Sequence, residues 1–443
     1  MDTLQQYIVI VLLLGVLICG LFPVECRAVR NGTENHFFKF LKLQGLFEKY
    51  SVNLTEEMFT PQNVSMVGAQ FNCPSSVSPT VPKSVHLLRP GDIKVIGAVG
   101  DSLTVAYAAG ASRFTPVMFE YPGQSASMGG DKTLEEIITI PNIFRKYNSH
   151  LHGYSTGLSI IDTQPINKKL NLAISGAVAE EMPEQVRKLI RKMKNDPIID
   201  FENDWKFITI LIGGNDLCGG CLNSESSPEN YIRYLEKAIQ ILHDECPRTF
   251  VNVLGMFTVN QVVKLRGSLR CNVLLAYYCP CVLGGSVPEN FVYLRSREFQ
   301  RLLRVSIESG KYDDKHDFAA VYQPFYEDTL LPELPNGKVD RSFVAPDCFH
   351  PSQKGQAAQA TANWNNLFEP VGSKDTSYDT GETINCPSKD FPYLYTNVNS
   401  KPGFLAQSQR PSLNDNQIPR TPSTSSSKLR SQDEDNIILQ KIP

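Results

Sequence analysis

The chain has 443 residues, a length that allows one large domain or roughly two to three ordinary ones. Lys and Arg number 43 against 46 Asp and Glu, and the resulting formal net charge of −3 excludes a basic nucleic-acid-binding protein and an acidic disordered one. Hydrophobic residues make up 42% of the chain, which is enough for a full-sized core, and the single long apolar run excludes a polytopic membrane protein.

That apolar run lies near the N-terminus, over Tyr7–Phe22, and carries no charge. Pro23 and a small-residue exit near Cys26 to Ala28 follow it, so we expect a signal peptide over residues 1–28 and a secreted protein. Because Asp2 is acidic and no Lys or Arg precedes the run, an uncleaved segment that attaches the chain to a membrane is the alternative.

A lead-in segment over residues 29–83 follows the expected signal peptide. Its Asn-x-Ser/Thr sequons predict glycosylation at Asn31, Asn53 and Asn63. Its cluster His36–Leu41 favours an amphipathic helix packed on the domain, and contact with a membrane surface is the alternative.

Of the 11 cysteines, Cys19 and Cys26 precede the expected cleavage site, and nine remain. An oxidising compartment predicts disulfides among them, and the odd number leaves one thiol free or joined to another chain. Cys218 and Cys221 form one close pair, and Cys279 and Cys281 form a second. Because secretion favours disulfides and no His stands at zinc-finger spacing, we interpret both pairs as disulfides that staple loops, with a zinc or redox site as the alternative. We expect no metal or other cofactor. The candidate disulfide cysteines are Cys73, Cys218, Cys221, Cys246, Cys271, Cys279, Cys281, Cys348 and Cys386.

From residue 84 onward, short apolar runs alternate with segments of helical periodicity. Such runs are typical of strands buried on both faces of a sheet. The runs are Ile93–Val99, Leu170–Ile174, Phe207–Ile212, Phe250–Leu254 and Phe318–Val321, and the amphipathic segments are Glu184–Lys194, Tyr231–His243 and Phe299–Ile307. This order predicts an α/β domain over residues 84–374, with three α/β/α layers and a mostly parallel, roughly five-stranded sheet. Residues 375–443 are polar, and we expect them to form a disordered tail.

Parallel sheets bind ligands beyond the carboxyl ends of their strands, so polar residues that follow the runs are the candidate site. Ser102 follows the first run, where a strand-to-helix turn would expose its hydroxyl as a nucleophile. Gly176 after the second run and Asn215 after the third can offer a backbone N–H and a side-chain amide to a developing oxyanion. Each of these segments alone also fits a plain turn.

His350 lies beyond the fifth run, three residues after Asp347. A neutral His accepts the proton of a serine hydroxyl when its other ring nitrogen is held by an acceptor, and Asp347 can be that acceptor. Alone, this segment also fits a surface His beside a capping Asp. Together the segments supply a nucleophile, a base, an orienting group and oxyanion donors.

These segments resemble the sequence blocks of the GDSL or SGNH hydrolase family, and the chain is more similar still to the animal membrane-associated phospholipase B branch. The matching blocks are Gly100-Asp101-Ser102-Leu103, Ser175-Gly176, Gly213-Gly214-Asn215-Asp216 and Asp347-Cys348-Phe349-His350. The similarity extends over residues 84–374 and includes Leu88–Val95, Asp204–Lys206, Gln323–Phe325 and Trp364–Asn366.

The resemblance implies an SGNH-hydrolase, flavodoxin-like fold and metal-independent hydrolysis of acyl esters of glycerophospholipids and lysophospholipids. It implies that Ser102 is the nucleophile, His350 the general base and Asp347 the group that orients the base. The oxyanion hole would consist of the Ser102 and Gly176 N–H groups and the Asn215 amide. The vertebrate members of the branch resemble tandem repeats with a C-terminal membrane span, and since this chain has one copy and no such span, membrane attachment is not implied.

The leading hypothesis is a secreted serine-type lipid esterase that acts on phospholipid or lysophospholipid, contacts a membrane surface peripherally and binds no nucleic acid. An esterase for small acyl or acetylated-sugar esters would use the same residues, with a shallow polar groove in place of a long apolar slot. A non-catalytic lipid-binding protein on the same fold is the alternative of another class, and the complete set of site residues argues against it. A redox protein that acts through Cys218 and Cys221 is a further alternative.

Overall fold

The computed structural model describes residues 67–112, 119–161, 163–221, 223–283, 287–288 and 290–405. The expected signal peptide, the cluster His36–Leu41 and the chain beyond residue 405 lie outside these residues, as do the three sequons at Asn31, Asn53 and Asn63. The chain divides into two units after Pro402, and the sheet, the helices around it and the site all lie in the first unit.

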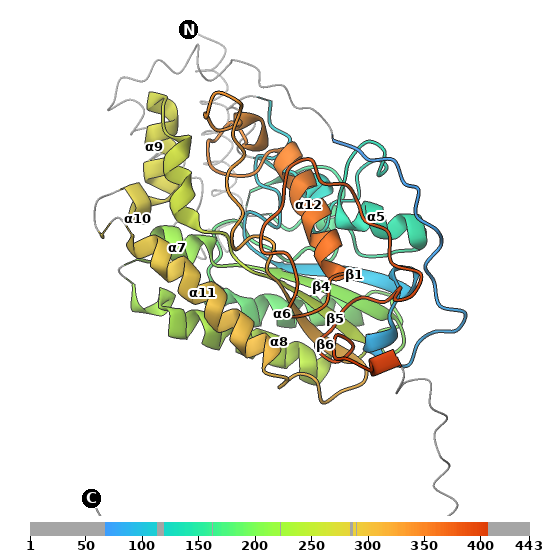
Figure 1. Cartoon of the computed structure of the whole chain (residues 1–443). Helices are drawn as coiled ribbons and strands as arrows, with labels where there is room; N and C mark the ends of the chain where they lie inside the picture. Colours follow the sequence, from blue (N-terminus) through green and yellow to red (C-terminus); the bar gives the residue numbers. More distant parts are fainter. Residues whose placement is uncertain are drawn as a thin grey trace, which may run out of the picture. The chain divides into compact units, whose positions relative to one another are not determined.

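Four parallel strands form the central sheet in the order β1-β4-β5-β6 (Figure 1). Every residue of these strands except Lys94 is buried, as expected for strands covered on both faces. Because the strands are parallel, the loops that follow them emerge at one edge of the sheet. The strands are β1 (Ile93–Gly100), β4 (Trp205–Leu211), β5 (Thr249–Leu254) and β6 (Phe318–Gln323).

Helices cover both faces of the sheet, which confirms the three-layer α/β architecture (Figure 1). One face is covered by α6 (Met182–Lys194), α8 (Pro228–Glu245) and α11 (Phe291–Glu308), which contain the three predicted amphipathic segments. The other face carries α5 (Ile140–Tyr147) and α12 (Gln353–Leu367). Helix α6 buries its apolar side, Val186, Leu189, Ile190 and Met193.

Several short elements complete the fold. Helix α10 (Pro280–Leu283) contacts both α7 (Gly214–Gly219) and α9 (Leu269–Tyr278), and α7 follows β4 closely. An antiparallel ribbon pairs β2 (Phe119–Glu120) with β3 (Ser159–Ile160). The 3-10 helices are Val85–Leu87, Pro90–Asp92, Pro122–Gln124, Ile166–Lys168, Ala179–Glu181, Ser224–Ser226, Val259–Leu265 and Arg341–Phe343.

The cysteines of the described residues form four disulfides and leave one thiol free. The free thiol belongs to the buried Cys246. Cys218 and Cys221 are not joined to each other, so they form no redox pair; each is joined to a cysteine of the second close pair. The disulfides are Cys73–Cys386, Cys218–Cys279, Cys221–Cys281 and Cys271–Cys348.

The packed part of the chain extends beyond the expected limits of residues 84–374. The Cys73–Cys386 disulfide joins segments on either side of those limits, and Leu394 is fully buried. The expectation of a disordered tail is therefore wrong for residues 375–402. Their composition is polar, but Cys386 and a few apolar side chains are enough to attach them to the domain.

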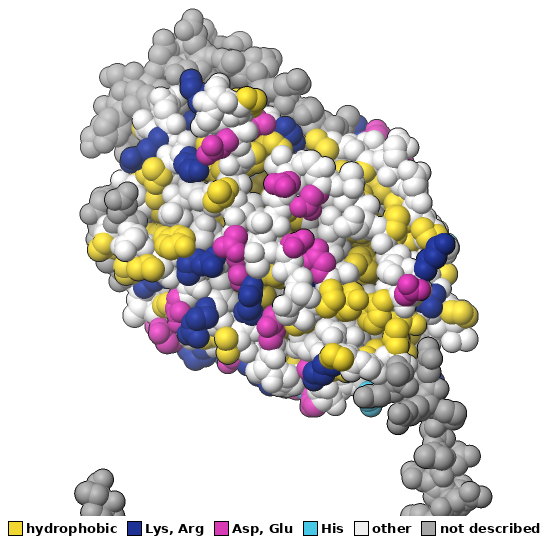
Figure 2. Space-filling view, in the orientation of Figure 1, with side chains coloured by type: hydrophobic (Ala, Val, Ile, Leu, Met, Phe, Trp, Pro, Cys, Tyr) yellow, Lys and Arg dark blue, Asp and Glu magenta, His cyan; other side chains and the backbone are white. Residues whose placement is uncertain are grey.

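The surface carries mixed charge. Figure 2 shows basic and acidic side chains interspersed on one face, with no large field of one sign, as the near-balanced composition predicts. Within the described part of the chain, no helix combines the length and the apolar character needed to cross a membrane.

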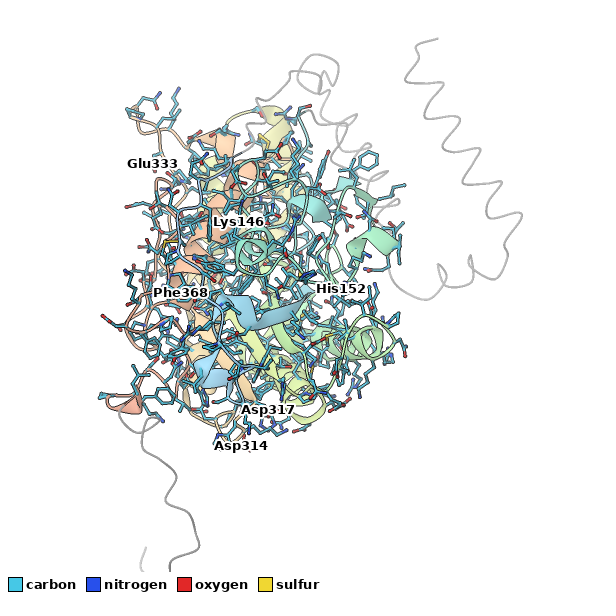
Figure 3. All side chains as sticks on the ribbon, turned by 90° about the vertical axis from the view of Figure 1, so that its right-hand side faces the viewer. Lys146, His152, Asp314, Asp317, Glu333 and Phe368 are labelled. Atoms are coloured by element: carbon cyan, nitrogen blue, oxygen red, sulfur yellow. A yellow bond between two sulfur atoms is a disulfide. The ribbon has the colours of Figure 1, made fainter. Side chains whose placement is uncertain are left out.

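The sequence predicted five strands, whereas the described residues form a sheet of four. The segment Leu170–Ile174 contacts the free edge of β1 through one bridge, between Asn171 and Ala98, and through one further bond from Ile174 N to Gly100 O. The same edge is bridged by His152, which lies beside β1 in Figure 3 and pairs with Val95. Because two segments share this edge, neither pairs over enough residues to form a strand.

Candidate active site

Ser102 lies in the tight turn that follows β1. A Cβ atom on Gly100 would lie 2.4 Å from the carbonyl oxygen of Leu211, so only glycine allows β1 to pass so close to β4 here. The helix expected after Ser102 does not form: successive turns follow, with Ala106 and Ala108 at positive φ. Left-handed residues interrupt helix propagation, so Ser102 has no helix dipole behind it.

The structure brings Ser102, His350 and Asp347 together from two distant parts of the chain. The imidazole Nε2 of His350 lies 2.8 Å from Ser102 Oγ, and its Nδ1 lies 2.5 Å from Asp347 Oδ2. All three residues are buried, with Ser102 7% exposed and Asp347 fully enclosed. This geometry allows a neutral imidazole to accept the serine proton while the carboxylate fixes its tautomer.

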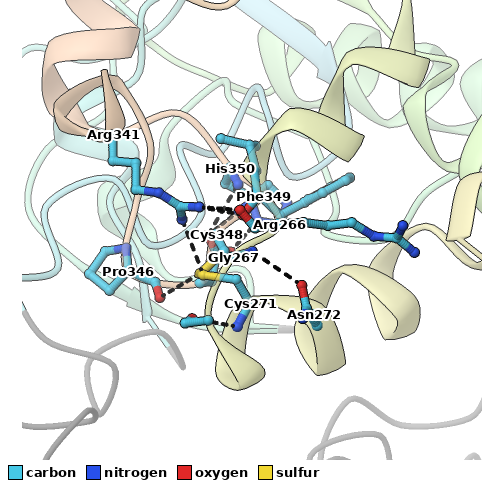
Figure 4. Close-up of a disulfide and its surroundings, with 12 residues drawn as sticks. Arg266, Gly267, Cys271, Asn272, Arg341, Pro346, Cys348, Phe349 and His350 are labelled. Carbon is cyan, nitrogen blue, oxygen red and sulfur yellow. Dashed lines mark hydrogen bonds and ion pairs between the residues drawn. A yellow bond between two sulfur atoms is a disulfide. The ribbon is translucent and has the colours of Figure 1, made fainter. Parts of the chain in front are cut away.

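Asp347 also organises the turn that carries His350. Its Oδ1 accepts the backbone N–H groups of Phe349 and His350, each at 3.1 Å. Cys348, between these residues and Asp347, has a φ of +61° and is joined to Cys271 of α9 (Figure 4). The turn is therefore held by a carboxylate on one side and a disulfide on the other.

Two tyrosine rings lie against His350. The ring centroid of Tyr107 is 4.6 Å from the imidazole, and that of Tyr278 is 5.5 Å away. Burial raises the pKa of both phenols, so both stay protonated at neutral pH. Sequence reasoning missed both residues; the only available signal for Tyr278 was its place beside the close pair Cys279 and Cys281.

The predicted oxyanion donors lie on the same pocket as Ser102. Ser175 and Gly176 are the central residues of a turn that Ala177 N closes on Ile174 O, and Gly176 takes a φ of +84° that favours glycine. In α7, Asn215 donates one amide hydrogen to Ala177 O at 2.8 Å. A side-chain amide carries two hydrogens, so the second remains available to a bound oxyanion.

The pocket has a volume of about 430 Å³, within the range of sites that hold small molecules. Aromatic and apolar side chains line it together with small polar residues. The lining residues are Ser102, Tyr107, Ser175, Gly176, Val178, Asn215, Gly219, Gly220, Asn223, Ser226, Tyr277, Tyr278, Pro280, Phe349 and His350.

Two buried carboxyl groups lie behind this pocket. Burial raises the pKa of Asp101 to about 7, although its carboxylate accepts the N–H of Leu103. Burial also raises the pKa of Asp216 to about 6, and this carboxylate accepts the N–H of Ala179. Both carboxyl groups lie in the core, and each holds a backbone segment beside the pocket in place.

A comparison with protein families shows which family has this sequence pattern. Residues 96–363, more than half of the chain, match the model of the GDSL-like lipase/acylhydrolase family. The chain belongs to this family. The α/β fold and the ester-hydrolase class predicted from the sequence are thereby confirmed, and the family match includes Ser102, Gly176, Asn215, Asp347 and His350.

Three curated proteins are similar to this GDSL-family chain. The chain is 42% identical to human "Phospholipase B1, membrane-associated" over 81% of its own length and 25% of the relative. It is 40% identical to the rat protein of the same name over 76% of the chain and 24% of the relative, and 43% identical to the mouse protein over 73% and 22%. The chain thus spans about a quarter of the length of these relatives.

Proposed function

We propose that this chain is a secreted serine esterase that hydrolyses fatty-acyl esters of glycerophospholipids and lysophospholipids through an acyl-enzyme. The observation that carries the proposal is the 2.8 Å contact between Ser102 Oγ and His350 Nε2, with Asp347 on the other ring nitrogen. A non-catalytic lipid-binding protein would have no need of this arrangement.

In the first half of the reaction, His350 Nε2 accepts the proton of Ser102 as Oγ attacks the ester carbonyl carbon. The bond between this carbon and the alcohol oxygen then breaks, and His350 donates the proton to the leaving oxygen. In the second half, a water molecule gives its proton to His350 and attacks the acyl-enzyme. The fatty acid leaves and Ser102 recovers its proton.

Negative charge develops twice on the carbonyl oxygen during this sequence. The N–H groups of Ser102 and Gly176 and the free amide hydrogen of Asn215 are the donors we assign to it. Preorganised donors of this kind stabilise the transition state more than the substrate and so raise kcat. Asp347 stabilises the imidazolium that forms at the same moment.

A lipid substrate is supported by the pocket walls and by the relatives. Tyr277, Tyr278 and Phe349 give the pocket an aromatic side suited to an acyl chain. Phe349 also borders a second, mostly apolar cavity of about 100 Å³ that Val262 and Leu265 help to line. The named activity of the three relatives, phospholipase, fits these surfaces.

Secretion is supported by the four disulfides, because such bonds persist in oxidising compartments. The full chain expressed in animal cells should appear in the medium, and a glycosidase should reduce its mass if Asn31, Asn53 and Asn63 are modified. Retention of the unprocessed chain on membranes would instead support the uncleaved N-terminal segment.

A fluorophosphonate probe tests the nucleophile. We expect covalent labelling of the wild-type protein and no labelling of Ser102→Ala. An unlabelled but folded wild-type protein would remove the proposed mechanism, and labelling that survives in Ser102→Ala would place the nucleophile elsewhere.

Matched substrates test the acyl group. We expect release of fatty acid from a lysophospholipid and little release of acetate from a peracetylated sugar. Acetate release without fatty acid release would favour an esterase for small acyl or sugar esters.

A further inference from the structure

A buried ion pair lies beside the site, outside the residues that carry the proposed reaction. Glu120 of β2 and Lys168 of the short helix Ile166–Lys168 approach to 2.5 Å, and each side chain is only 1% exposed. Removing two charges from water is unfavourable, and a buried pair is on average weak evidence of added stability. The role of this ion pair is therefore indicated by the residues that it contacts.

Each polar group of this pair has further partners. Glu120 Oε1 accepts the hydroxyl of Ser175 at 2.7 Å, and Oε2 accepts the hydroxyl of Ser159 at 2.9 Å. Lys168 Nζ also donates to Thr163 O at 2.9 Å. With these bonds Glu120 is a fixed anchor, because charge-assisted hydrogen bonds to a buried carboxylate are short and strong.

One of these bonds leads directly to the pocket. Ser175 and Gly176 share the turn described above, and the peptide between them carries the Gly176 N–H that we assign to the oxyanion hole. The Ser175 hydroxyl bond to Glu120 therefore constrains the orientation of that peptide. The bond from Ser159 is of the same type but starts on β3, and Ser159 does not line the pocket.

The backbone of Glu120 is also paired with a residue that lines the pocket. It forms a bridge with Tyr107, whose ring packs against the imidazole of His350. Glu120 thus contacts the turn of Ser175 and Gly176 through its side chain. Through its main chain it contacts Tyr107, the residue that packs against the proposed base.

We propose that Glu120, held by Lys168, is a positioning residue that orients the Gly176 N–H toward the oxyanion through the Ser175 hydroxyl. This inference rests on the proposed esterase function. A donor that is misaligned by a fraction of an ångström stabilises the transition state less but leaves the binding of the ground state nearly unchanged.

Two serine variants form a matched test. Ser175→Ala and Ser159→Ala each remove one serine hydroxyl that donates to the Glu120 carboxylate, and both leave the ion pair with Lys168 in place. For Ser175→Ala we expect kcat for lysophospholipid hydrolysis to fall about tenfold, with KM within about twofold of the wild type. For Ser159→Ala we expect kcat within about twofold, and we expect thermal stability to change equally in both variants.

The rate of fluorophosphonate labelling is the second measurement, because phosphonylation of Ser102 also places an oxygen in the oxyanion hole. It should fall in Ser175→Ala and stay near the wild-type rate in Ser159→Ala. The conservative variant Glu120→Gln, which retains the size of the side chain, should likewise lower kcat without raising KM.

The outcomes separate this inference from the function on which it rests. If the wild-type protein hydrolyses lipid through Ser102 but kcat of Ser175→Ala is unchanged, the positioning role is wrong and the esterase stands. Equal losses in Ser175→Ala and Ser159→Ala, or a change confined to KM, would also overturn it. Failure of the wild-type protein to react at Ser102 would instead remove the function itself.

Discussion

The disulfide between Cys271 and Cys348 holds the turn from Asp347 to His350 against helix α9 (Figure 4). Helix α9 also ends at Tyr278, whose ring contacts the imidazole. Two further disulfides connect the segment just after α9 to the region of α7. Cys279 is joined to Cys218 of α7, and Cys281 is joined to Cys221, which lies two residues beyond the end of α7. Helix α7 also carries Asn215. The proposed base and one proposed oxyanion donor are thus covalently connected through one short segment.

Removing this disulfide should lower kcat as well as the stability of the fold. In the double variant Cys271→Ser/Cys348→Ser, the His350 turn gains freedom, and we expect kcat to fall about tenfold to hundredfold. The free energy of unfolding should fall by about 2–5 kcal/mol. Steady-state hydrolysis and denaturant unfolding measure the two effects.

The Cys73–Cys386 disulfide provides a matched control. It joins the two ends of the described domain, and neither cysteine lines the pocket. Cys73→Ser/Cys386→Ser should lose a similar amount of stability and keep kcat within about twofold. Equal losses of kcat in both double variants would show that general loosening of the fold, and not the His350 turn, controls the rate.

Asp347→Asn separates the charge of Asp347 from its structural role. The amide oxygen can still accept the N–H groups of Phe349 and His350, so the turn should persist. The amide NH₂ group would face Nδ1, which favours the wrong imidazole tautomer, and we expect kcat to fall on the order of 10³–10⁴-fold. Kinetics beside circular dichroism test this, and a fall of less than tenfold in a folded variant would contradict the proposed role.

Asn215→Ala tests the side-chain oxyanion donor. The contact with Ala177 O orients the amide, and its removal leaves the oxyanion with backbone donors alone. We expect kcat to fall about 10²–10³-fold, with a much smaller change in KM. A large rise in KM at unchanged kcat would instead assign Asn215 to ground-state binding.

The order of strands and helices could be predicted because it depends on local patterns. Phe250–Leu254 is apolar except for Asn252 and forms most of a buried strand, β5. Leu170–Ile174 has a similar composition but forms no strand, because the segment around His152 occupies part of the β1 edge. That competition is between segments distant in the sequence, and no local pattern reveals it.

The same distinction applies to the site. Ser102, Asn215 and His350 could be selected because each stands in a short motif after an apolar run. Ala106 has a high helix propensity, and its positive φ became visible only in the structure, where Tyr107 pairs with β2. Glu120 and Lys168 are one Glu and one Lys among 46 acidic and 43 basic residues, and single charged residues are usually exposed, so nothing local indicated a buried pair.

Because the carboxyl group of Asp101 is buried, we expect the stability of the protein to depend on pH. Burial raises its pKa from 3.8 in the unfolded chain to about 7, and the nearby Asp216 carboxylate adds to the shift. Between these values the folded state binds more protons than the unfolded state, so this group makes the protein less stable as the pH rises. A shift of this size corresponds to a few kcal/mol, on the order of 1.4 kcal/mol per unit.

Asp101→Asn removes the ionisation and should flatten this dependence. Asparagine can still accept the N–H of Leu103 through its amide oxygen, so the turn can persist. The fall in Tm between about pH 5 and about pH 8 should be smaller in the variant by several degrees. Part of the slope should remain, because burial also raises the pKa of Asp216 to about 6. Identical Tm profiles for the wild type and the variant would show that Asp101 does not retain its proton in the folded protein, and a fall in Tm at every pH without a change of slope would show that the variant only weakens the turn.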